Sequence, residues 1–261
     1  MLFRSKQIGT SAAPQLLIPV GARSTALSGS NIASVSGIDA IYWNPAGASV
    51  IESQAEAVLS YQNYLADINI TYAGAVAHLG AAGNFGLTFK TLNFGNIEQT
   101  TIDDPDGNGT IFSPNFITLG MHYSRKFTDR IQFGTNVKII QEKIMSAAAS
   151  GVALDFGLQY VNDATGLKLG VALTNFSIQK MQYTGADLEY RIQLPGTEAG
   201  TTPSSVSMVS SEAGFPTQLK LGVGYDLDLG ELNQLSFNGS FSNNSSFYDN
   251  VALGVEYGFN D

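Results

Sequence analysis

The sequence predicts an all-β fold, specifically an up-and-down antiparallel β-barrel of the outer-membrane type. Ten segments alternate apolar and polar residues, and side chains of a β-strand point alternately to opposite faces. The connections between these segments alternate between short turns and long loops. Only 13% of the residues are charged, about half the share in an ordinary soluble domain. These three observations are typical of a transmembrane barrel whose apolar face meets lipid.

Composition excludes several other classes. The net charge of −9 leaves no basic stripe for nucleic acid. The absence of cysteine excludes disulfides and thiolate metal sites. A transmembrane helix is excluded because no run of about 18 apolar residues exists. Residues 1–6 lack the apolar region and cleavage site of a signal peptide, so we expect a mature form or a truncated reading frame.

The alternation places the expected strands in order along the chain. They are 54–61, 68–79, 83–92, 115–125, 130–141, 151–161, 166–176, 217–228, 233–242 and 249–259.

Each expected strand has one apolar register, which we expect to face outward. The first strand has the weakest pattern. The outward candidates are Ala55, Ala57, Leu59 and Tyr61; Ile68, Ile70 and Tyr72; Phe85, Leu87 and Phe89; Ile117, Leu119, Met121 and Tyr123; Ile131, Phe133, Val137 and Ile139; Val152, Leu154, Phe156, Leu158 and Tyr160; Leu167, Leu169, Val171 and Leu173; Leu219, Leu221, Val223, Tyr225 and Leu227; Leu235, Phe237 and Phe241; and Val251, Leu253, Val255, Tyr257 and Phe259.

The charged residues of these strands keep to the opposite register. Charge on the lipid face near the midplane costs roughly 2–4 kcal/mol for Lys or Arg. A sheet with one solvated face would show the same bias, so the pattern indicates one-sided sheets and favours a barrel. The residues concerned are Lys90, Lys138, Asp155, Lys168, Lys220, Asp226 and Glu256.

The connections distinguish the two ends of the expected barrel. Tight turns are expected at 80–83, 126–129, 162–165 and 230–232, and longer loops at 62–67, 93–114, 142–150, 177–216 and 243–248. In outer-membrane barrels the short turns are periplasmic and the long loops extracellular. Ten strands therefore put residues 1–53 and Asp261 on the periplasmic side.

Residues 1–53 do not alternate and carry a motif. The stretch reads Ile18-Pro19-Val20-Gly21-Ala22-Arg23, then Ala26-Leu27-Ser28-Gly29-Ser30, then Asp39-Ala40-Ile41-Tyr42-Trp43-Asn44-Pro45-Ala46-Gly47. It resembles the PorV/PorQ family of outer-membrane proteins, and the Asn44-Pro45-Ala46 step resembles the hatch of the wider FadL-like group. Ser28-Gly29-Ser30 and Ala48-Ser49 depart from the usual family pattern.

The resemblance implies a FadL-like barrel of fourteen strands, of which about ten are present here. It also implies that residues 1–53 fold into the lumen as a plug or hatch, and that residues 54–261 form the barrel with its C-terminal strands missing. The plug-motif residues carried over are Gly21, Ala22, Arg23, Asp39, Trp43, Asn44, Pro45, Ala46 and Gly47.

The chemistry of the motif residues also predicts their local structure. Pro45 restricts Asn44 to an extended conformation, and the Asn44 side chain can bond nearby backbone to fix a turn. If Arg23 is buried it needs a partner, which Asp39, Asp155 or Glu256 could supply.

The other groups of polar residues predict neither a metal site nor a catalytic site. Asp104, Asp106 and Asn108 resemble the start of a calcium loop, but Asn115 stands where the bidentate acid belongs, so a solvated loop is favoured over a calcium site. His78 and His122 lack carboxylates at ligand spacing, so neither predicts a metal site. No catalytic motif is present. We therefore expect no enzyme activity and no cofactor.

Three functions remain open. The resemblance implies a component of the type IX secretion system that holds secreted cargo and delivers it to the cell surface, with outer-membrane lipid, cargo and other secretion components as partners. The alternative is a FadL-like transporter of hydrophobic molecules, which the small and polar lumenal register disfavours. A soluble β-sandwich binding module is the third. For the first, the 177–216 loop is the expected recognition surface.

Overall fold

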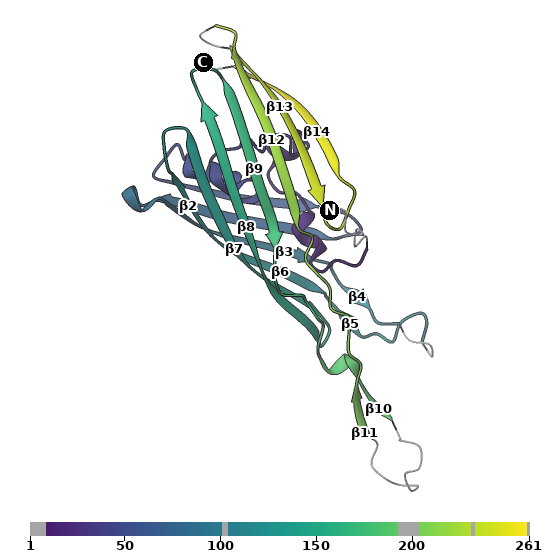
Figure 1. Ribbon diagram of the computed structural model, residues 1–261. Coiled ribbons are helices and arrows are strands. Elements are labelled where there is room, and N and C mark those ends of the chain that lie inside the picture. The colour runs from purple at the N-terminus through teal and green to yellow at the C-terminus, as the bar shows by residue number, and fades with distance from the viewer. Residues whose placement is uncertain (1–8, 101–103, 193–203, 231–232, 260–261) are drawn as a thin grey trace, which may run out of the picture.

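The computed structural model describes residues 9–100, 104–192, 204–230 and 233–259. Its main element is a sheet of ten antiparallel strands (Figure 1). The strands are β1 (Ala55–Asn63), β2 (Asn69–His78), β3 (Asn84–Asn93), β6 (Asn115–Lys126), β7 (Ile131–Ile144), β8 (Ala147–Asn162), β9 (Leu167–Phe176), β12 (Gln218–Asp228), β13 (Asn233–Asn244) and β14 (Asn250–Phe259).

The ten strands pair strictly in chain order, so every neighbour in the sheet is also the next large strand in the sequence. This is the up-and-down arrangement that the alternating connections predict. Among the described residues, β1 pairs only with β2 and β14 only with β13. The described strands therefore form an open sheet with two free edges, and they do not close into a barrel.

All ten expected strands are present, but three of the five expected long connections are wrong. Residues 64–68 separate β1 from β2 and residues 245–249 separate β13 from β14, no more than separate β2 from β3 at an expected tight turn. The sequence indicated a long connection at 142–150, whereas β7 and β8 continue to a tight turn at Met145 and Ser146. The longest connections also contain short hairpins that were not expected. These are β4 (Ile97–Glu98) with β5 (Ile111–Phe112), and β10 (Glu189–Ile192) with β11 (Ser204–Ser207).

The outer face of the sheet is apolar and exposed. Leu87, Met121 and Val223, on three different strands, keep 65%, 55% and 49% of their surface exposed. The predicted outward register is confirmed in nine of the ten strands, with the exposed and half-buried positions alternating as expected.

The outward register of β2 is a correction. Ile70 and Tyr72 are 1% and 5% exposed, so they face inward, and the alanines of β2 face outward instead. Ile70 packs in a buried cluster with Leu92 and Phe116, and Ile68 packs against the edge of that cluster. The larger side chains of β2 thus fill the interior, where packing stabilises them more than exposure would.

The N-terminal segment lies within the curve of the sheet, against its inner face (Figure 1). It contains the short helices η1 (Pro14–Leu17), α1 (Ala22–Ala26), α2 (Ala40–Trp43) and η2 (Pro45–Ser49). The main apolar core forms where this segment meets the sheet: it joins Ile32, Val35, Ala40, Ile41, Trp43 and Ala48 to Val76 of β2 and Ala172 of β9. In the described part of the chain, no helix is both long and apolar enough to cross a membrane.

Candidate functional site

The contact between the N-terminal segment and the inner face of the sheet is built around Asn44. This residue is fully buried and extended, with φ −149° and ψ 101°, as the following Pro45 requires. Its side-chain oxygen accepts a hydrogen bond from the Ala46 backbone N–H at 3.2 Å and so caps η2. Its amide nitrogen donates to the Ile32 carbonyl at 2.9 Å. The predicted turn role of the Asn-Pro step is confirmed.

Glycines of the sheet let this turn approach the strands closely. A Cβ on Gly134 of β7 would lie 2.1 Å from the Pro45 carbonyl oxygen, and one on Gly157 of β8 would lie 2.2 Å from Asn44 Oδ1. Gly47 is fixed in the same way, since its Cβ would lie 1.9 Å from the Val35 carbonyl oxygen. Only glycine fits at these three positions without movement of backbone.

Arg23 ties the first half of the motif to the last described strand. Its guanidinium donates two hydrogen bonds, each 2.8 Å long, to the two carboxylate oxygens of Glu256 in β14. Glu256 was one of three partners proposed from the sequence. This hydrogen bonding outweighs partial burial and raises the pKa of Arg23. The Asp39 carboxylate also attracts the Arg23 guanidinium, but more weakly than Glu256 does. Gly21 lies close to the same carboxylate, since a Cβ on Gly21 would be 3.3 Å from Asp39 Oδ1. Ala22 begins α1 beside them.

The two aromatic residues of the motif hold the chain that precedes it. Tyr42 donates its hydroxyl proton towards the Leu16 and Ile18 carbonyls, each at 2.9 Å, and Trp43 Nε1 donates to the Val20 carbonyl at 2.9 Å. Burial raises the pKa of Tyr42 far above its usual range, so the hydroxyl stays protonated and remains a donor. The motif therefore organises residues 14–47 into one packed unit.

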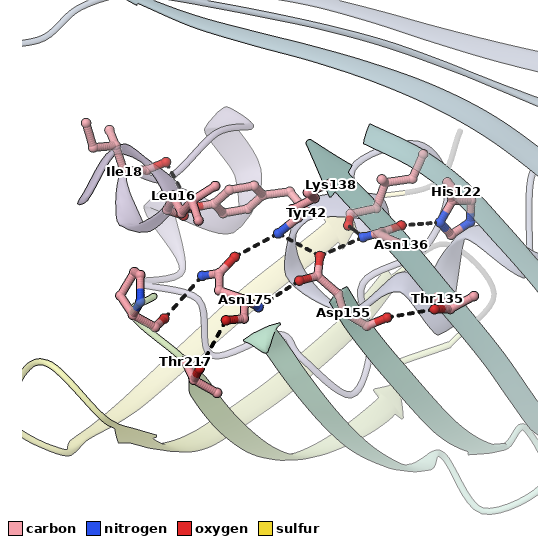
Figure 2. Close-up of polar contacts among 12 residues, drawn as sticks. Leu16, Ile18, Tyr42, His122, Thr135, Asn136, Lys138, Asp155, Asn175 and Thr217 are labelled. Carbon is pink, nitrogen blue, oxygen red and sulfur yellow. Dashed lines mark hydrogen bonds and ion pairs between the residues drawn. The ribbon is translucent and has the colours of Figure 1, made fainter. Parts of the chain in front are cut away.

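A second anchor is a polar network around Asp155 (Figure 2), which the sequence did not predict. Asp155 is fully buried, and its carboxylate lies 2.7 Å from Lys138 Nζ. Asn136 donates to this carboxylate at 2.9 Å and to the Ile41 carbonyl at 2.7 Å. The network thus joins β7 and β8 to the N-terminal segment.

The network extends to β6 and β9. The His122 ring lies 2.6 Å from Asn136 Oδ1 and 2.9 Å from Ser124 Oγ. Lys138 Nζ also donates to Asn175 Oδ1 at 2.9 Å. His122 is therefore held by an amide and a hydroxyl.

An irregularity in β9 explains how the Asp155 carboxylate is satisfied. The β8–β9 register shifts at Leu154 and Phe156, and Asn175 adopts a left-handed conformation with φ 58°. The Asn175 backbone N–H turns away from the ladder and donates to Asp155 Oδ1 at 2.8 Å. Asn tolerates this conformation better than most residues. Its polarity amid the apolar pattern of the strand is the one sequence signal for this bulge.

The candidate calcium loop stays a prediction. Asn108 Oδ1 accepts a hydrogen bond from the Thr110 backbone at 2.8 Å, and the Asp104 carbonyl accepts one from Gly107. No group of three or more His, Asp or Glu residues able to hold a metal ion occurs in the described ranges. Asp106 is exposed there.

The described parts of the longest connection, 177–192 and 204–217, are joined to each other and to the sheet. Met181 bridges to Ala213, and Ala148 of β8 bridges to Thr184. Tyr183 donates its hydroxyl to Glu142 of β7, and burial raises the pKa of that hydroxyl. Ile178, Met208 and Val209 nevertheless remain 90%, 55% and 81% exposed.

The site thus packs the motif residues against the inner face of the sheet. A family model of the type IX secretion system protein PorV matches residues 3–244, which is most of the chain. The chain belongs to the PorV family. A search of curated proteins found no match. The PorV match spans the motif, the Asp155 network and the 177–217 connection, and it assigns the chain to a type IX secretion system component.

Proposed function

We propose that this chain is an outer-membrane β-barrel protein that holds secreted cargo of the type IX secretion system and delivers it to the cell surface. Residues 54–261 form the wall, and residues 1–53 form a plug within the lumen. The observation that carries the proposal is the sheet itself, which is apolar on its outer face and packed with the N-terminal segment on its inner face, together with the PorV family match.

The outer face supports a lipid environment. Exposed apolar side chains follow one another across neighbouring strands, from Leu59 at 78% to Leu253 at 81%. Soluble monomers rarely expose a contiguous apolar patch of more than a few hundred Å². Hydrocarbon chains solvate such a surface at no cost, whereas water does not.

The two free edges of the sheet are an argument that further strands belong to the barrel wall. In a bilayer, unpaired backbone groups cost several kcal/mol each because no water is available to them. β1 and β14 each present one unpaired side. We propose that additional strands pair with these edges and complete the fourteen-stranded barrel that the family resemblance implies, with the short turns periplasmic and the long loops extracellular.

Cargo recognition is proposed for the 177–217 connection. Its hydrogen bonds to β7 and β8 fix its base, and its exposed Ile178 and Val209 supply an apolar contact surface. Binding residues commonly lie on loops that a rigid scaffold positions.

The test is purification of the complete gene product from native outer membranes in mild detergent, with mass spectrometry of the co-purifying proteins. We expect secreted proteins that share a C-terminal β-domain. The double variant Ile178→Ser, Val209→Ser should reduce their recovery several-fold. The control variant Leu65→Ser, at a position 69% exposed in another connection, should not.

Two results would overturn the proposal. Recovery of the protein in the soluble fraction would exclude the membrane wall. Co-purification of apolar small molecules without secreted proteins would favour a transporter instead.

A further inference from the structure

Four lysines point to the inner face of the sheet, and three of them have oxygen partners. Lys90 donates to the carbonyls of Gln15 and Ile18 at 2.8 and 2.5 Å. Lys138 pairs with Asp155 at 2.7 Å, and Lys168 pairs with Asp226 at 2.5 Å. These contacts are what the cost of burying a charge requires.

Lys220 of β12 is the exception. It is only 8% exposed, yet its ammonium group has no hydrogen-bond acceptor and no carboxylate partner among the described residues. Its Nζ lies over the ring of Trp43, with the ring centroid 5.2 Å away. A ring face attracts a cation, but it does not accept the three hydrogen bonds that an ammonium group can donate.

The Lys220 side chain lines a pocket of about 230 Å³ between the N-terminal segment and the strands β12, β13 and β14. The pocket is smaller than the roughly 300–1,000 Å³ of sites for drug-sized ligands. Its remaining wall mixes the hydroxyls of Thr25, Ser28 and Ser242 with the apolar groups of Leu17, Pro19 and Trp43.

We propose that this pocket binds a small carboxylate, with Lys220 as its charge partner. One buried ammonium group balances one negative charge, which matches a carboxylate better than a phosphate dianion. Thr25, Ser28 and Ser242 lie on the pocket wall with hydroxyls that can donate to the second carboxylate oxygen. Leu17, Pro19 and Trp43 of the same wall are apolar groups that a short apolar tail could contact.

The chain carries its own reporter, because Trp43 is its single tryptophan and lines the pocket. The experiment titrates the complete protein in detergent with acetate, butyrate and octanoate and follows Trp43 fluorescence, with 1-butanol and inorganic phosphate as comparison solutes. We expect a saturable change with the carboxylates and none with 1-butanol. Tighter binding of octanoate than of acetate would assign the site to the end of a longer chain, and equal binding to a free small acid.

Two variants locate the binding. Lys220→Met should weaken carboxylate affinity at least about tenfold, since a hydrogen bond to a charged group is lost. Lys143→Met removes the same charge at an exposed position outside the pocket and should leave affinity unchanged. Ser242→Leu keeps Lys220 but places a larger side chain in the pocket, so it should weaken carboxylate affinity at least as much.

The proposal fails if the native protein gives no saturable change, if 1-butanol gives the same change, or if phosphate binds more tightly than the carboxylates. It also fails if folded Lys220→Met and Ser242→Leu both bind like the native protein. Because the assay needs no cargo, its outcome is separate from that of the secretion role.

Discussion

The two faces of this one sheet are organised by different rules. The outer face is a surface of exposed aliphatic and aromatic side chains, such as Leu87 and Val223, whose requirement is only to be apolar. The inner face is specified residue by residue, with glycines under Asn44 and Pro45 and with Asn136 bonded both to Asp155 and to the Ile41 carbonyl. A generic face suits a fluid solvent such as lipid, and a specific face suits a fixed partner, here the N-terminal segment.

The largest effect should come from breaking the inner network at its centre. Asp155→Ala leaves Lys138 buried at 9% exposure without its carboxylate, which typically costs about 3–5 kcal/mol. Urea unfolding in lipid vesicles measures the loss. The double variant Asp155→Ala, Lys138→Met should recover much of it, because no unpaired charge remains. Equal stability of the single and double variants would show that the pair does not contribute as described.

A charge on the outer face should have the next largest effect. Val223→Arg should lower the free energy of unfolding in vesicles by roughly 2–4 kcal/mol, the cost of Arg at the bilayer midplane. Val223→Leu is the matched apolar control. Substitutions on a water-exposed surface usually change the free energy of unfolding by about 0.5 kcal/mol or less. A change that small for Val223→Arg would contradict the assignment of this face to lipid.

Adding a single methyl group, by Gly→Ala, should have different effects on the two faces of the sheet. Gly134→Ala would place Cβ 2.1 Å from the Pro45 carbonyl oxygen, whereas Gly239→Ala on the outer face would meet Leu253 at an ordinary 3.4 Å. The inner variant should cost about 1–3 kcal/mol through overpacking, and the outer one should be neutral or slightly stabilising. Protease cleavage near Asn44 in the inner variant, and not in the outer one, would sharpen the comparison. Similar stabilities would weaken it.

The weakest inner contact should be the ion pair of Arg23 with Glu256. Its two side chains are 55% and 32% exposed, and exposed pairs contribute about 0–1 kcal/mol. Arg23→Gln should therefore change the unfolding midpoint only slightly, and less at high salt because the pair is screened. A loss as large as that of Asp155→Ala would mean that this pair is buried in the complete protein.

The sequence predicted the sheet well because a period of two and a one-sided charge register are local signals. The prediction for β2 was wrong because Ile70 and Tyr72 are buried on the inner face of the sheet. Alternation alone does not show whether an apolar register faces lipid or the protein core. The sequence anticipated the local bonds of Asn44, since Pro45 and Ala46 are its neighbours. It missed the pairing of Lys138 with Asp155 and Asn175, because these residues meet only through strand register and a left-handed residue in β9.

The difference between the faces can be measured directly by tryptophan quenching in vesicles of brominated phospholipid, which quenches only indoles that touch acyl chains. The native protein carries Trp43 on the inner side, and Leu87→Trp adds a second indole on the outer face. The account predicts little quenching of the native protein and a new, strongly quenched component in the variant. Quenching of Trp43, or an unquenched indole at position 87, would contradict the assignment of the two faces.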